Sequence, residues 1–312
     1  MLVREMNDNT KRTFSERGLI SNRLECMEIL ILDLDIYSSQ LKDSFYCLPT
    51  RPDLAFYFLW MSVNRAYRDF YLKDSVLGTE SIMGKKMVES ISGHLIERIS
   101  LNNTIESLMK SYLNNFGEQI FKFLGNIILK GLSIEKYCNA NGLVSRNYIN
   151  SQYKTLKSRF KDVIEAVKET YLSSYYNDLS DIKFENNVIL LQSSEENTQK
   201  VRSLSLKLKK LSMKEEVTFS NNQVNYSKKI RLSDQEFVMM YYQILNSIRN
   251  SNIHGNGNSR LSTPNAKKKN IKNSEAIYLA TYFYFGLEMY LLGKIHLDDL
   301  VLFEKNIKLL VN

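Results

Sequence analysis

Apolar residues recur at helical spacing along most of the chain. Within 53–72, 104–129 and 234–254 they fall three or four positions apart, which is the spacing of one helix face. We also expect helices at 145–176, as one long element, and at 275–292, which is apolar. Only 3 prolines and 12 glycines interrupt the chain. The pattern therefore predicts a mostly α-helical protein with long helices.

Capping residues predict where further helices begin. Asn22 with Glu25 three positions later marks the start of a helix that reaches about residue 46. Asp53 follows two prolines and caps the helix at 53–72. Helices are also expected near 79–100 and 195–213, and the helix at 104–129 contains two glycines at which it can break.

One short stretch alternates like a pair of strands. Residues 182–184 and 188–191 are rich in β-branched and large apolar side chains, and three polar residues separate them. They form a candidate β-hairpin in the otherwise helical fold. The segment 219–230 is polar and fits neither period, while 255–272 is expected to be a long polar loop.

The organisation along the chain divides into four consecutive regions. Residues 1–20 form a charged, flexible lead, 21–118 an N-terminal helical region, 119–180 a helical middle region and 181–312 a C-terminal region. Hydrophobic residues make up 44% of the chain and charged residues 24%, which is typical of a globular protein. A chain of 312 residues can bury a substantial core in one or two domains.

The charge of the chain is positive and unevenly distributed. The net charge is +8, and the window 200–272 holds 15 Lys or Arg against 4 Asp or Glu, a local excess of +11. This excess favours a polyanionic partner such as RNA, although a solvated basic face is the ordinary alternative. The lysines that we expect to contact RNA are Lys207, Lys209, Lys210, Lys267, Lys268 and Lys269.

Cysteines and apolar runs give no sign of a metal, a disulfide or a membrane span. Cys26, Cys47 and Cys138 lack metal-ligand spacing and suit a reducing cytoplasm. The longest apolar run, 278–292, contains Glu288 and is too short to span a bilayer. Residues 1–17 are too polar for a signal peptide. We therefore expect a cytoplasmic protein with no membrane contact, no metal and no cofactor.

The end of the helix at 234–254 carries the clearest candidate chemistry. Arg249 and His254 are separated by four residues, and Gly255 then ends the helix. A guanidinium that grips phosphate and an imidazole that titrates near neutrality thus lie within about one and a half turns of each other. The pair suits phosphodiester cleavage without a metal. Helix capping is the ordinary alternative role for both residues.

This arrangement resembles the motif of the HEPN superfamily (higher eukaryotes and prokaryotes nucleotide-binding), whose ribonucleases carry Arg, four to six residues and then His. Asn250 after the arginine and Gly255 after the histidine fit the motif. A second likeness is the helix at 53–72, in which Trp60, Asn64 and Tyr67 are spaced as in the early aromatic helix of some larger HEPN proteins. The two likenesses cover a minor part of the chain.

The resemblance implies a fold and an activity. The fold would be a HEPN-like helical bundle made from the helices near 53–72, 234–254 and 275–292, with additional helices and one candidate β-hairpin. The activity would be that of a metal-independent endoribonuclease in phage defence, or of a toxin that cleaves tRNA or other RNA. An antitoxin or another regulatory partner would then be expected.

The resemblance also implies a mechanism. His254 would act as general acid or base on the ribose 2′-OH or the 5′-oxygen, while Arg249 would stabilise the phosphate and Asn250 would orient it. The products would be a 2′,3′-cyclic phosphate and a 5′-hydroxyl. One motif supplies one imidazole, so a homodimer with two motifs in one cleft would supply both the acid and the base.

The segment 133–150 supports a different function. Cys138 lies four positions before Gly142, and a helix capped by Ser145 would follow, which resembles a helix-turn-helix that binds DNA. The residues facing the groove would be Arg146, Asn147 and Asn150. A tight αα-corner is the structural alternative. A DNA-binding regulator and a catalytically inactive HEPN-like module that binds RNA or a partner stay open beside the ribonuclease.

Overall fold

The computed structural model confirms a mostly α-helical protein. It describes residues 35–48, 51–74, 93–98, 103–171, 182–186, 188–191, 194–253 and 268–311. Contacts between residues divide the chain into two compact units. We name them the bundle unit, 1–117 with 248–312, and the middle unit, 118–247. The four consecutive regions expected from the sequence stay a prediction.

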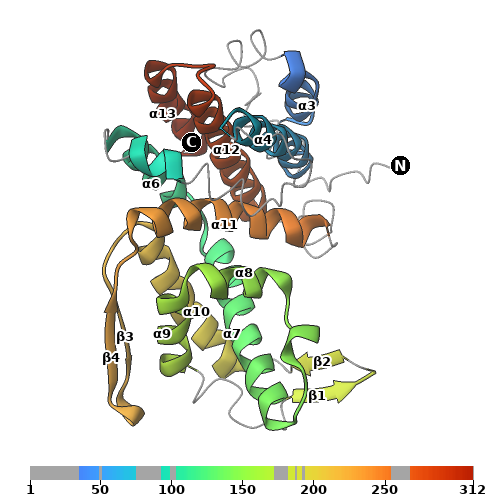
Figure 1. The fold of residues 1–312 in the computed structure, drawn as a ribbon, viewed down its shortest axis with the longest axis vertical. Helices are drawn as coiled ribbons and strands as arrows, with labels where there is room; N and C mark the ends of the chain where they lie inside the picture. Colours follow the sequence, from blue (N-terminus) through green and yellow to red (C-terminus); the bar gives the residue numbers. More distant parts are fainter. Residues whose placement is uncertain are drawn as a thin grey trace. The chain divides into compact units, whose positions relative to one another are not determined.

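The bundle unit is built from helices at both ends of the chain. Its long helices are α3 (Asp35–Tyr46), α4 (Pro52–Asp74), α6 (Asn103–Asn114), α12 (Lys268–Leu291) and α13 (Leu297–Val311). Figure 1 shows α12 between α4 and α13, and α12 packs against both. Because α12 is surrounded, it is buried on nearly every face, which is why its sequence is apolar with little periodicity.

Aromatic rings fill the core of the bundle unit. The ring of Phe283 stacks on Tyr112 with centroids 4.7 Å apart, and the Tyr112 hydroxyl donates to the carbonyl of Phe303 at 2.7 Å. Gly286 makes room for Phe303, since a Cβ at 286 would lie 2.7 Å from Cζ of that ring. Stacked and edge-on pairs of this kind add to the energy of area burial.

The middle unit combines helices with two β-ribbons. Its helices are α7 (Glu118–Ala140), α8 (Ser151–Arg159), α9 (Lys161–Tyr171) and α10 (Glu195–Ser212), with a 3₁₀ turn, η2 (Ser145–Asn147). Its strands are β1 (Ile182–Glu185), β2 (Val188–Leu191), β3 (Val217–Asn221) and β4 (Tyr226–Ile230). The helix α11 (Asp234–Ile253) begins in this unit and passes its boundary after Ser247.

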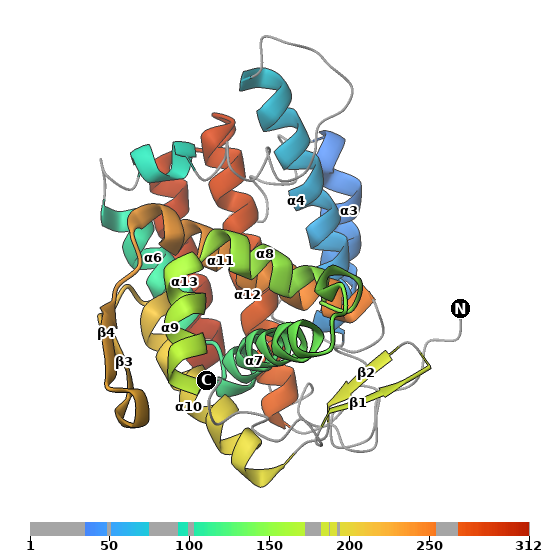
Figure 2. The same ribbon diagram turned by 60° about the horizontal axis from the view of Figure 1, so that its bottom comes forward.

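The first β-ribbon confirms the predicted hairpin, and the second was not predicted. Strands β1 and β2 pair antiparallel with Ile182 opposite Leu191. Strands β3 and β4 also pair antiparallel, and Figure 2 shows this ribbon beside α9 and α10. Val217 and Phe219 are buried while the residues between them are exposed, so the alternation is present in β3. In β4 the alternation between apolar and polar residues is difficult to recognise from the sequence, because Ile230 is the only buried residue of that strand.

The prediction of one long helix at 145–176 is wrong. The segment forms η2, α8 and α9 instead, and the structure describes it only to Tyr171. The Asn150 side chain accepts a 2.7 Å hydrogen bond from the amide of Gln152 and so starts α8. Phe160 interrupts the helical dihedrals between α8 and α9 (φ −121, ψ 54) and is buried. The Asn150 cap and the buried Phe160 therefore divide the segment, although its apolar residues keep helical spacing across both positions.

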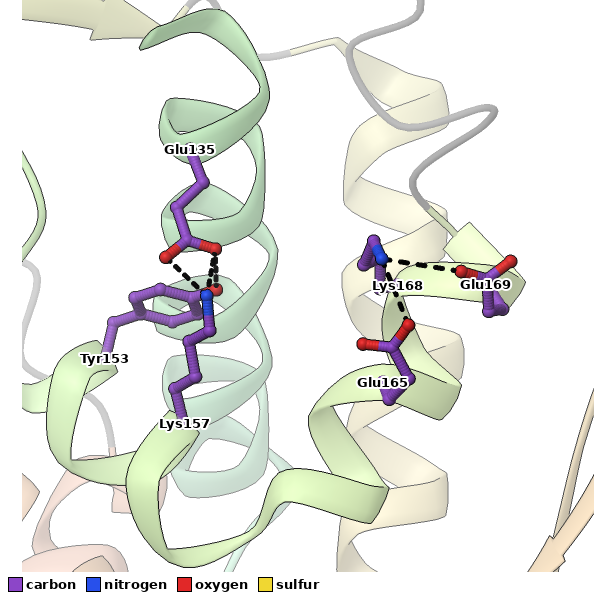
Figure 3. A network of polar contacts seen from close by, with 6 residues as sticks. All are labelled: Glu135, Tyr153, Lys157, Glu165, Lys168 and Glu169. Atoms are coloured by element: carbon purple, nitrogen blue, oxygen red, sulfur yellow. Dashed lines mark hydrogen bonds and ion pairs between the residues drawn. The ribbon is translucent and has the colours of Figure 1, made fainter. Parts of the chain in front are cut away.

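Gly131 and Tyr153 fix α8 against α7. A Cβ at residue 131 would lie 2.2 Å from Cγ of Tyr153, so only glycine admits the ring. Figure 3 shows the Tyr153 hydroxyl beside Glu135, and it donates to Oε2 of that carboxylate at 2.8 Å. Lys157 donates to both oxygens of the same carboxylate at 2.7 Å. Tyr153 therefore packs its ring against Gly131 and also gives its buried hydroxyl a hydrogen-bond partner in Glu135.

Candidate functional site

The helix α11 positions the Arg249–His254 motif, and its beginning is defined by a capping box. The Ser233 amide donates to the Glu236 carboxylate at 2.9 Å, and the Glu236 amide donates back to the Ser233 hydroxyl at 3.3 Å. The predicted apolar stripe is buried throughout: Phe237, Met240, Tyr241, Ile244, Leu245 and Ile248. The helix predicted at 234–254 is thereby confirmed as Asp234–Ile253.

The structure describes two of the three motif residues. Arg249 and Asn250 are half-buried in the last turns of α11, and Nη1 of Arg249 donates to Oδ1 of Asn250 at 2.8 Å. His254 lies outside the described residues. The distance between the guanidinium and the imidazole stays a prediction. The Asn250 amide holds the guanidinium, a role that the sequence pattern did not specify.

A second polar group of the bundle unit lies at the start of α4. Pro52 occupies the first helical position, where a missing N–H costs nothing. Arg51 grips Asp53 with two parallel bonds, Nε to Oδ1 at 2.8 Å and Nη2 to Oδ2 at 2.7 Å. Asp53 is 3% exposed. A bidentate pair of this kind matches the charge of the buried carboxylate and fixes both side chains.

Within the bundle unit, the pKa of Tyr57 responds both to Asp53 at the start of α4 and to Arg249. Burial and the nearby Asp53 carboxylate raise the pKa of Tyr57 to about 12, and the Arg249 guanidinium opposes that rise. The positive charge of Arg249 is therefore felt at the Tyr57 hydroxyl, as the smallest of the three influences on its pKa. Since Arg51 already balances Asp53, Arg249 adds positive charge beside Tyr57. The arrangement can bind an anion such as phosphate.

The residues of the second likeness on α4 are mainly core residues. Trp60 is 3% and Tyr67 4% exposed, and the Trp60 ring lies 5.8 Å from that of Phe56. Asn64 is exposed. Two of the three side chains therefore have a packing role in this fold.

Lys207 has a structural role that the sequence did not indicate. Its Nζ donates to the carbonyl of Thr218 at 2.8 Å and lies 4.8 Å from the ring centroid of Phe219. Burial lowers the pKa of Lys207. The lysine thus fastens α10 to strand β3, and nothing in the sequence distinguishes it from Lys209 and Lys210 on the same helix.

The structure describes only some of the other lysines that we expect to contact RNA. Lys210 is exposed on α10, and Lys209 is half-buried there. Lys268 and Lys269 form the first turn of α12, but their side chains lie outside the described residues, as does all of Lys267. Their contacts with RNA stay a prediction.

Ion pairs reduce the positive excess of the window 200–272. Three partners come from outside it: Glu118 near Arg202 at 3.4 Å, Asp162 near Lys228 at 2.9 Å, and Glu196 near Lys200. Two further pairs lie within it, Lys214 with Asp234 and Lys229 with Glu216. A charge count along the sequence therefore overstates the positive charge that the folded surface presents.

The helix-turn-helix geometry predicted at 133–150 is not formed as expected. Gly142 has a left-handed backbone (φ +66) at the predicted turn, but Ser145 begins a 3₁₀ turn and the next α-helix begins at Ser151. Asn150, expected to face a groove, is occupied as the cap of α8. Arg146 and Asn147 are exposed on the 3₁₀ turn rather than on a helix face. The segment is an αα-corner with a long turn.

The described part of the chain contains neither a cluster of metal ligands nor a helix that could span a membrane. Within these residues, no three His, Cys, Asp or Glu side chains gather in a way that would hold a metal ion. None of the described helices has both the length and the apolar character needed to cross a membrane.

Comparisons with known proteins found no match among protein-family models, curated proteins or solved structures.

Proposed function

We propose that this protein is a metal-independent endoribonuclease of HEPN type that acts in defence against phage or as a toxin. Its substrate would be RNA, with tRNA as one candidate. The active side chains would be Arg249 and His254, with Asn250 in support.

The observation that carries the proposal is the environment of Arg249. The guanidinium stands on the last turns of a helix, is held by Asn250 and acts on Tyr57 beside an already neutralised Asp53. Because Arg51 already balances the charge of Asp53, the positive charge of Arg249 is available to a phosphate. A purely structural arginine would instead be expected to pair with a carboxylate of its own.

The chemistry follows from the residue types. His254 would remove the proton from the ribose 2′-OH, which attacks the adjacent phosphorus, and Arg249 would balance the charge that develops on the phosphate oxygens. The 5′-oxygen leaves after protonation, giving a 2′,3′-cyclic phosphate and a 5′-hydroxyl. A homodimer would supply the second imidazole as the acid.

The test is RNA cleavage in EDTA by the wild type and by Arg249→Ala and His254→Ala. Each variant should lose about 10²- to 10⁴-fold in rate, the typical effect of one acid–base or charge-stabilising group. Arg231→Ala and His296→Ala are matched controls, because both side chains are exposed and distant in sequence from the motif. A wild type that binds RNA without cleaving it would indicate the inactive module instead.

A further inference from the structure

A chain of polar side chains joins α8 to residues 243–247 of α11 within the middle unit. Nε2 of Gln152 donates to the carbonyl of Ser247 at 3.0 Å. Nε2 of Gln243 donates to the Ser247 hydroxyl at 3.1 Å, and Arg159 donates through Nη1 to Oε1 of Gln243 at 3.0 Å. We call these four residues the α8–α11 clamp.

Three of the four clamp residues are buried and Arg159 is half-buried, so water has little access to the bonds among the buried three. Gln243 and Ser247 are 0% exposed and Gln152 is 6% exposed. A buried amide that lost its partner would pay the full desolvation cost, and this makes the bonded arrangement strongly preferred. The polar atoms of Gln152, Gln243 and Ser247 that form these bonds therefore favour one orientation of α8 against α11, although Nε of Arg159 has no partner among the described residues.

Arg159 determines the direction of the chain of bonds. A guanidinium has donors only, so Gln243 must present its oxygen to Arg159 and its NH₂ group to Ser247. The Arg159 guanidinium also lies 5.7 Å from the ring centroid of Tyr242, which restricts its position. The amide of Gln243 therefore has one orientation, in which its NH₂ group donates to the Ser247 hydroxyl.

The bond from Gln152 is placed on the turn that leads to Arg249. In an α-helix the carbonyl of residue 247 accepts from the amide of residue 251, so this carbonyl belongs to the turn that carries Arg249 and Asn250. The helix α11 continues without interruption to Ile253. A side chain that holds the Ser247 carbonyl therefore acts on the backbone from which Arg249 extends.

We propose that Gln152, supported by Gln243 and Arg159, is a positioning residue that holds the last turn of α11 in the geometry required by Arg249. The effect on activity rests on the proposed ribonuclease function, whereas the effect on the helix does not. The expected effect of removing the bond is local loosening after residue 247, because helix ends open more easily than helix centres.

The experiment compares wild type, Gln152→Met and Gln235→Met by hydrogen exchange and by RNA cleavage. Methionine keeps the length of the side chain and removes its donors. Gln235 is an exposed control on the first turn of the same helix. In Gln152→Met, amides 249–253 should exchange about three- to tenfold faster, the value of one net hydrogen bond, while amides 238–246 change little. Gln235→Met should match the wild type.

The cleavage readout separates positioning from binding. Gln152→Met should lower kcat by about 10- to 100-fold with KM nearly unchanged, as expected when a reacting group is displaced. Unchanged exchange at 249–253, or an equal increase along the whole helix, would overturn the proposal. If the wild type does not cleave RNA, the proposed function fails, and the exchange result still decides whether the clamp positions the turn.

A second variant covers the case in which Gln152→Met does not fold. Ser247→Ala removes only the hydroxyl to which Gln243 donates and leaves the bond from Gln152 to the carbonyl. It should produce the same pattern of exchange at 249–253 with a smaller increase. A uniform increase or no increase in this variant would equally overturn the proposal.

Discussion

The two units differ in how they accommodate particular buried polar side chains. In the middle unit the buried amides of two glutamines are hydrogen-bonded between α8 and α11: Gln152 donates to the carbonyl of Ser247, and Gln243 accepts from Arg159. In the bundle unit Glu288 is 0% exposed, and neither carboxyl oxygen meets a hydrogen-bond partner among the described residues. Burial raises the pKa of Glu288 well above its ordinary value. The bundle unit therefore buries one carboxyl without a partner among the described residues, whereas the middle unit bonds its buried glutamine amides between helices.

The largest expected effect is that of Gly131→Ala in the middle unit. The new Cβ would meet the Tyr153 ring at its attachment point, which cannot move away without shifting α8. We expect a loss of about 3 kcal/mol in the free energy of unfolding. Urea denaturation measures it.

Gly125→Ala is the matched control on the same helix. Its Cβ would lie 3.5 Å from the nearest atom, the carbonyl of Val201, which is ordinary contact. This variant should be neutral or should gain up to about 1 kcal/mol from helix propensity. Equal destabilisation by the two substitutions would refute the packing argument.

Replacement of Glu288 should stabilise the bundle unit. The unfolded carboxyl titrates near 4.5, and the folded one holds its proton to higher pH, so the native state binds more protons in between. Stability therefore falls as pH rises from about 4.5 toward the raised folded pKa. Glu288→Met should gain about 1–3 kcal/mol at pH 8 and less at pH 4. Thermal melting from pH 4 to 9 measures the difference, and a gain independent of pH would contradict it.

Tyr153→Phe isolates the polar part of the contact between α7 and α8. It removes the hydroxyl that donates to Glu135 and keeps the ring against Gly131. We expect a loss of about 1 kcal/mol, and a smaller loss for Lys157→Ala because that side chain is 49% exposed. A double-mutant cycle between residues 153 and 157 measures their coupling, and a larger effect of the lysine would contradict this order.

The smallest expected effect is that of Tyr57→Phe on the pH dependence of RNA cleavage. With its pKa raised to about 12, Tyr57 stays neutral at every pH at which cleavage would be assayed. It can donate a hydrogen bond but cannot act as the base. The pH–rate profile between pH 6 and 9 should keep its shape in Tyr57→Phe. Loss of one limb of the profile would assign a proton transfer to Tyr57.

Local patterns were sufficient where one helix face or one cap decides the structure. The capping box of α11, its buried stripe and the hairpin of β1 and β2 follow from spacing within a few residues. Each of these features depends on neighbours in the sequence, and the backbone responds to them directly. The cap predicted at Asp53 is wrong, because α4 begins at Pro52 and Asp53 lies inside its first turn, where it binds Arg51.

The sequence by itself determined the mostly helical class, the bounds of α11 and the position of Arg249 at its end. Only the tertiary structure decided that Lys207 fastens a ribbon, that α8 begins at Ser151 and that Gln152 reaches Ser247. These contacts join residues between 11 and 95 positions apart, or depend on a buried ring such as that of Phe160. Periodicity reports which face of an element is buried, whereas the partner that buries it is chosen by packing among distant segments.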